Sequence, residues 1–173
     1  RRRLGVDTRM GEALEPRLRM CARAIVSALP REAVVDAVTE LGYPLAVRAQ
    51  ADWLGWQGAE DALLAWMAEN HAATRSADRA RAAAVAAAFD EIVAAQVRRR
   101  RDAGDAAPPD PTTELLHVRV NGARLSDADV VSILRNWTAG DLGSIAASLG
   151  VVVHFLATHP DVRVIDYTGS TLY

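Results

Sequence analysis

The sequence predicts a mainly α-helical protein, and three observations lead to this fold class. Apolar residues recur at intervals of three or four, which is the spacing of one face of an α-helix. Alanine, the strongest helix former, is abundant, whereas β-branched runs are confined to a few valine-rich patches. Hydrophobic residues make up 50% of the chain and charged residues 24%, a balance typical of a soluble globular domain.

The chain length of 173 residues suggests one domain that is long enough to bury a core. The chain does not start with methionine, so we expect a single partial domain over residues 1–173 that belongs to a longer protein. Its helical region covers residues 10–162, with a loop at residues 102–111. Residues 163–173 form a tail that matches no expected element.

The first half of the helical region contains two predicted segments. Apolar residues on a 3.6-residue period predict a helix over Glu12–Leu29, which Pro30 ends. A second helical segment covers Glu32–Leu54. We expect a break or kink in its middle, because Gly42 and Pro44 fall there.

Two further helices follow, over Gly58–His71 and Ser76–Arg101. The stretch Thr74–Asp78 predicts a turn, with Ser76 as the N-cap of the second helix. That helix ends in four arginines at 98–101. Because cations are favourable at a helix C-terminus, we interpret these arginines as a solvated helix end rather than a phosphate-binding patch.

A proline-rich linker over 102–111 precedes the last part of the chain. We expect a short helix over 112–118 and a turn at the Asn-Gly pair at 121–122. Ser126 is then a strong N-cap for a long helix over Asp127–Thr158, which ends because the residue before Pro160 disfavours helical geometry.

The long helix contains an apolar run that could span a membrane by length alone. Arg135, Asn136, Asp141 and His154 lie within it, and each charge would be costly in a bilayer. We therefore predict a buried core helix and no membrane contact. A net charge of −2 also gives no drive toward nucleic acid.

Cysteine and histidine residues give weak functional signals. Cys21 is the single cysteine, which excludes an internal disulfide and is typical of a reducing cytoplasm. The N-terminus lacks the apolar stretch of a signal peptide, and we predict a cytoplasmic protein. His154 and His159 lie on different helix faces, so we predict no metal site from these residues.

Two glycines of the long helix, Gly140 and Gly143, lie within four positions of each other. Each costs about 1 kcal/mol relative to alanine inside a helix. Such a cost indicates that something presses closely on this face, either another backbone or a flat ligand.

The order of these features resembles the cytochrome P450 family of bacterial type. The stretch from Asp36 to Gly55, with Pro44 at its centre, is similar to a family segment that ends in Leu-Gly. Residues 125–129 resemble the family's entry to its long distal helix, and residues 156–161 resemble its exit. The resemblance covers about residues 10–162 and implies an internal portion from the third to the tenth helix of that fold.

In that family an Ala-Gly step of the distal helix lies over the haem. The resemblance implies that Ala139, Gly140 and Gly143 line the haem-binding face. It also implies catalytic roles for Asp141 and Ser144 in proton delivery.

The distal motif departs from the family pattern at two positions. Leu142 occupies the family's acid position and Gly143 its threonine position. Asp141 supplies a carboxylate one residue early, about 100° around the helix. The usual acid–alcohol pair is therefore absent, which leaves peroxide as an alternative oxidant to O2.

The resemblance implies a haem-thiolate monooxygenase that hydroxylates a small or medium apolar organic substrate. Electrons would come from a redox partner of the ferredoxin or flavodoxin type. The family's Glu-x-x-Arg segment and its haem-ligating cysteine loop are not in this chain. We therefore expect the isolated chain to be inactive, since thiolate ligation supplies electron density to the iron.

A second hypothesis belongs to another functional class. The chain could be a stand-alone helical ligand-binding or interaction module without haem chemistry. In that case the face with Gly140 and Gly143 would be a helix–helix contact, because small residues also allow two backbones to approach.

Overall fold

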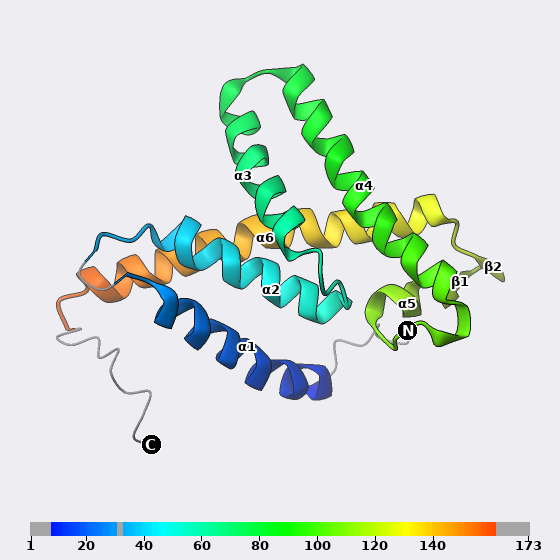
Figure 1. Ribbon diagram of the computed structural model, residues 1–173, viewed down its shortest axis with the longest axis horizontal. Helices are drawn as coiled ribbons and strands as arrows, with labels where there is room; N and C mark the ends of the chain where they lie inside the picture. Colours follow the sequence, from blue (N-terminus) through cyan, green and yellow to red (C-terminus); the bar gives the residue numbers. More distant parts are fainter. Residues whose placement is uncertain (1–7, 31–32, 162–173) are drawn as a thin grey trace.

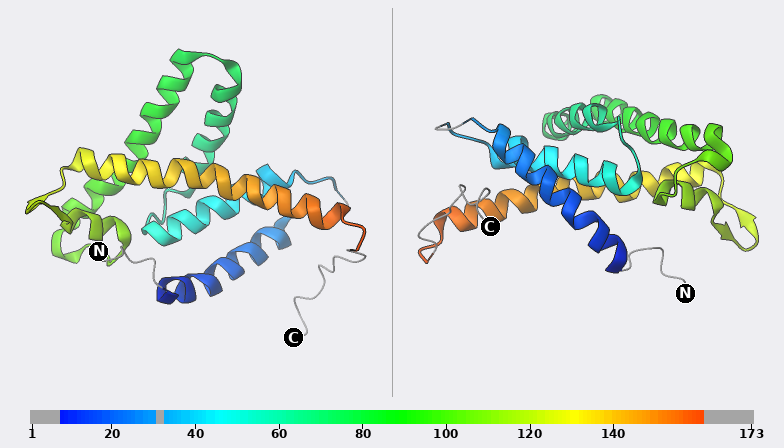
Figure 2. Two further views of the ribbon diagram at one scale, coloured as in Figure 1. Left: turned by 180° about the vertical axis from the view of Figure 1, so that it is seen from behind. Right: turned by 60° about the horizontal axis from the view of Figure 1, so that its bottom comes forward.

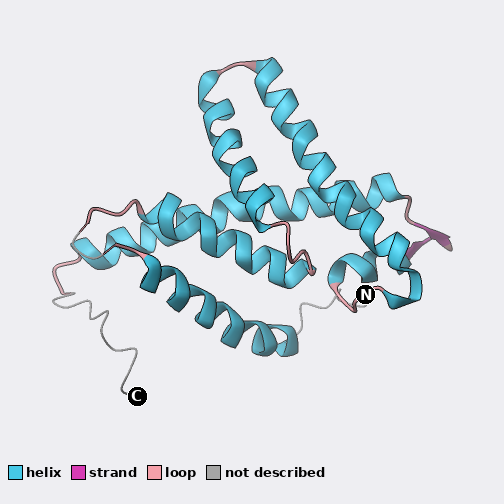
Figure 3. Cartoon of the chain, viewed as in Figure 1, coloured by secondary structure: helices cyan, strands magenta, loops and turns pink. Residues whose placement is uncertain are grey.

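The computed structural model describes residues 8–30 and 33–161, with side chains described from Leu14 onward. Within these residues it has six α-helices, two short helical segments and one two-stranded hairpin. The mainly α-helical fold class is therefore confirmed (Figure 3). The predicted tail at 163–173 lies outside the described residues.

Helix α6 (Asp127–Thr158) forms the long axis of the molecule (Figure 1). Helices α1 (Thr8–Ala28) and α2 (Tyr43–Leu54) lie beside it, and α1 packs on α2. Helices α3 (Glu60–Ser76) and α4 (Arg79–Ala103) form a hairpin that projects away from α6 (Figure 2). Helices α2 and α4 both pack on α6, whereas α1 packs mainly on α2, and α3 packs on α4 and α2.

Near Gly42 and Pro44, where a break or kink was expected, the helix changes type and is not interrupted. A short π-helical segment, η1 (Ala37–Gly42), leads directly into α2, and Gly42 itself has helical dihedral angles. Asp36 caps η1, because its side chain accepts hydrogen bonds from the backbone N–H groups of Val38 and Thr39. Pro44 lies in the first turn of α2, where its missing N–H costs no hydrogen bond.

The turn of the α3–α4 hairpin differs from the prediction. Asp78, not Ser76, is the N-cap of α4: its Oδ1 accepts from the backbone N–H groups of Ala80 and Arg81. Ser76 instead remains the last residue of α3, and its hydroxyl donates to the Ala73 carbonyl at 2.8 Å. Serine and aspartate are both favourable N-cap residues, so the sequence did not decide between Ser76 and Asp78 as the start of α4. In the structure the Asp78 carboxylate caps the helix.

The hairpin has an aromatic contact of its own. The rings of Trp66 and Phe89 stack with centroids 4.0 Å apart. The indole N–H of Trp66 donates to the Val85 carbonyl at 3.0 Å. Nearer the tip, Glu69 pairs with Arg81 at 2.7 Å. These contacts hold α3 to α4 along the part that projects from the bundle.

Arg100 is a buried anchor at the end of α4. Its guanidinium donates to both carboxylate oxygens of Asp110, with Nη2 to Oδ2 at 2.7 Å. It also donates to the carbonyl oxygens of Leu54, Gly55 and Gln96. These acceptors lie on α2, on α4 and in the loop before α5, so the buried guanidinium connects the three segments.

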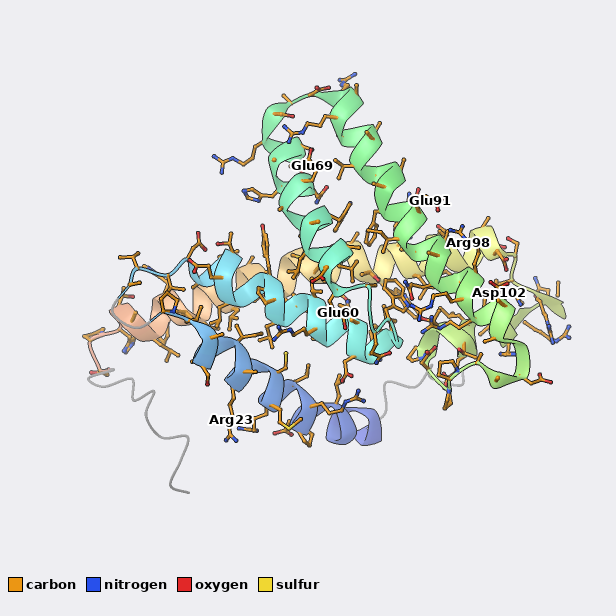
Figure 4. The ribbon with its side chains drawn as sticks, viewed as in Figure 1. Arg23, Glu60, Glu69, Glu91, Arg98 and Asp102 are labelled. Carbon is orange, nitrogen blue, oxygen red and sulfur yellow. The ribbon has the colours of Figure 1, made fainter. Side chains whose placement is uncertain are left out.

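The prediction of a solvated arginine run at 98–101 is therefore wrong for Arg100. It holds for Arg98, which is exposed and pairs with Glu91 on α4 at 3.0 Å (Figure 4). Arg99 is exposed as well, and Arg101 pairs with Asp127 of α6 at 2.7 Å. The four side chains thus point to different surroundings and form no single cationic patch.

The predicted linker at 102–111 contains the short helical segment η2 (Gly104–Ala106). Its last residues are packed against the core and are not exposed to solvent along their whole length. Asp110 is buried, and it caps α5 (Pro111–His117) by accepting from the Thr113 backbone N–H at 2.8 Å. In α5, Thr112 is buried between two partners: it accepts from the Trp56 indole and donates to the Leu54 carbonyl, both at 2.8 Å. The linker therefore closes one end of the core.

The connection into α6 follows the prediction. Strands β1 (Arg119–Val120) and β2 (Ala123–Arg124) pair antiparallel around the Asn-Gly turn at 121–122, where both residues have positive φ. The Ser126 hydroxyl accepts from the Asp129 backbone N–H, and the Asp129 carboxylate in turn accepts from the Ser126 backbone N–H, which completes a capping box at the start of α6. His159 is the C-cap residue, one before Pro160.

Among the described residues, α6 is the one helix that is long and apolar enough to cross a membrane by length and composition. Only 11% of its most apolar window is buried in the fold. The expected buried core helix is thus present over part of α6, while much of its apolar surface is uncovered.

Candidate functional site

Helix α6 buries one stripe of side chains, one at every fourth residue. The buried positions are Val130, Leu134, Thr138, Leu142 and Ala146. Gly140 and Gly143 lie on the opposite side and are exposed, together with Asn136 and Ala147. We call these four residues the open face of α6. A Cβ added at either glycine would meet no atom within 4 Å, so nothing described in the chain packs there.

Close packing against glycine does occur on α6, but at a different place. A Cβ added at Gly42, the last residue of η1, would lie 2.8 Å from the Ala146 carbonyl oxygen. One turn later, a Cβ added at Gly150 would collide with the Val38 side chain. The glycines that permit close helix approach are therefore Gly42 and Gly150, and the intrachain contact does not involve Gly140 or Gly143.

Asp141 faces α2 rather than the open face. Its Oδ2 accepts from the Gln50 amide at 3.2 Å, and the same amide donates to the Trp137 carbonyl at 3.4 Å. Gln50 is only 3% exposed, so this contact gives a buried amide its acceptors. The carboxylate predicted to deliver protons is thus directed about 100° away from Gly140 around the helix.

Ser144 and Ala139 border the open face on its two sides. The Ser144 hydroxyl is exposed and donates to the Gly140 carbonyl at 2.7 Å, one turn back along the helix. Ala139 is half-buried and packs against the edge of the core. Of the predicted site residues, Ala139, Gly140, Gly143 and Ser144 therefore lie close together, and Asp141 is turned to another side.

The open face fits a flat apolar group as a contact surface, because two glycines leave the helix backbone accessible over one turn. The described residues do not fit an axial thiolate. Cys21 lies on α1 and accepts a weak hydrogen bond from Arg48 at 3.8 Å, so it belongs to the α1–α2 surface. Among the described residues, the one thiol therefore lies away from the open face.

The histidines do not form a site within the described residues. No group of three or more His, Cys, Asp or Glu side chains there could hold a metal ion. His117 contacts the Thr113 carbonyl within α5, His71 contacts Arg75, and the His159 ring lies tilted against that of Phe155.

The sequence did not predict two polar contacts near the site, those made by Gln50 and Asp90. Gln50 holds Asp141, and Asp90 of α4 pairs with Arg135 of α6 at 3.3 Å. A glutamine inside an otherwise apolar stretch of α2 was the available signal for the first contact. For the second contact, no spacing rule links positions 45 residues apart.

Comparison of the chain with protein-family models and with curated proteins finds no match.

Proposed function

We propose that this chain is the distal portion of a haem-thiolate monooxygenase of the cytochrome P450 type. The observation that carries the proposal is the open face of α6, where Gly140 and Gly143 leave the backbone of a long helix uncovered. Each of these glycines lowers the stability of the helix relative to alanine. Within the described residues, no close packing against them offsets this loss. A flat ligand on that face accounts for their presence.

The open face lies on a helix that spans the molecule (Figure 1). The α3–α4 hairpin packs on α6 outside this face, through contacts such as that of Asp90 with Arg135. A small or medium apolar organic substrate would therefore bind over the open face without cover from the hairpin. When bound, the haem supplies oxygen activation with electrons from a redox partner of the ferredoxin or flavodoxin type.

The chain's own residues would then take the following roles. Ala139, Gly140 and Gly143 would form the contact surface, and the exposed Ser144 hydroxyl lies at its edge. Asp141, which accepts a hydrogen bond from Gln50, would be the nearest acid, about 100° around the helix from Gly140. Because no described residue supplies the thiolate, we expect no monooxygenase activity from this chain alone.

Haem titration of the full chain tests the proposal. We expect a shift in the haem absorbance spectrum and saturation at one haem per chain. Gly140→Leu and Gly143→Leu should weaken haem binding about tenfold or more, since a leucine would hold the flat ring away from the backbone. Ala87→Leu, on an exposed position of α4, is the matched control and should leave binding unchanged.

A folded chain that is indifferent to haem would contradict the proposal. That result would favour the second hypothesis, a helical interaction module without haem chemistry. In the described chain, the open face would then be a contact with another molecule, because no intrachain helix covers it.

A further inference from the structure

We draw no further inference here: the strongest candidate, the apolar groove of about 590 Å³ between α1, α2 and α6, carries none because nothing in the structure shows what covers it.

Discussion

The two halves of α6 differ in how the rest of the chain uses them. From Asp127 to Leu142 the helix has a capping box, buried side chains and polar residues with partners on α2 and α4. From Val151 to Leu156, beyond the contacts of η1 with Ala146 and Gly150, it has no charged residue and exposes large apolar side chains. One continuous helix therefore contains a core segment and a segment whose apolar surface the described chain leaves uncovered.

This difference shows that hydrophobicity along a helix does not report burial by itself. The more apolar half is the more exposed one, and the half with Arg135 and Asp141 is the better packed. The partnered half places its polar groups against neighbouring helices, where they orient the packing. The uncovered half marks surface that is available for another molecule.

The largest expected effect concerns the anchor that holds α4 and α5 at the packed end. Arg100→Met leaves the Asp110 carboxylate buried without its partner, which should lower the free energy of unfolding by about 3–5 kcal/mol. Arg99→Met, which changes an exposed arginine, should lower it by less than about 0.5 kcal/mol. Urea denaturation of both variants measures the difference, and equal midpoints would show that the buried pair is dispensable.

Leucine truncation in each half of α6 compares them directly. Leu142→Ala removes a fully buried side chain and should cost about 2–5 kcal/mol of unfolding free energy. Leu156→Ala should cost much less, because its side chain is partly exposed. Urea denaturation at a concentration where the chain is monomeric checks this, and a larger loss at position 156 would reverse the comparison.

Glycine replacement distinguishes the packed face of α6, which Gly42 of η1 contacts, from its open face. Gly42→Ala places a Cβ close to the Ala146 carbonyl oxygen and should destabilise the fold by about 1–3 kcal/mol. Gly140→Ala meets nothing and should stabilise it by about 1 kcal/mol through helix propensity. Thermal unfolding followed by circular dichroism measures the stability change of each variant. If Gly140→Ala were destabilising as well, the face at Gly140 would have to be covered.

The smallest effect concerns the cap of α6 and its pH dependence. Hydrogen bonds from Ser126 lower the pKa of Asp129 below its ordinary value of 3.8. A depressed pKa contributes stability that is present above the unfolded-state pKa and is lost as pH falls through the folded-state value. Asp129→Asn should therefore flatten the loss of stability below about pH 4, as measured by urea denaturation across that range. An unchanged pH profile would contradict this role of the capping box.

Much of the fold could be predicted because local signals decided it. Ser126 with Asp129 three residues later, the Asn-Gly turn at 121–122, and the change of helix type near Gly42 and Pro44 each depend on neighbours within a few residues. For the same reason the long helix was predicted with its observed bounds. Such features follow from backbone chemistry that the sequence displays directly.

The remaining features depend on partners far apart in the sequence. Arg100 looked like one of four solvated arginines, because its acceptors belong to α2 and to the loop before α5. Asp141 looked like a free acid, because Gln50 lies 91 residues away. Gly140 and Gly143 predicted close packing, but the packed glycines are Gly42 and Gly150, whose contact requires the placement of η1 on α6.

Hydrogen exchange along α6, measured on the full chain at a concentration where it is monomeric, tests the difference between the two halves most directly. We predict strong protection from Val130 to Ala146, where side chains are buried, and faster exchange from Val151 to Thr158. Equal protection of both segments, or slower exchange in the second, would contradict the account.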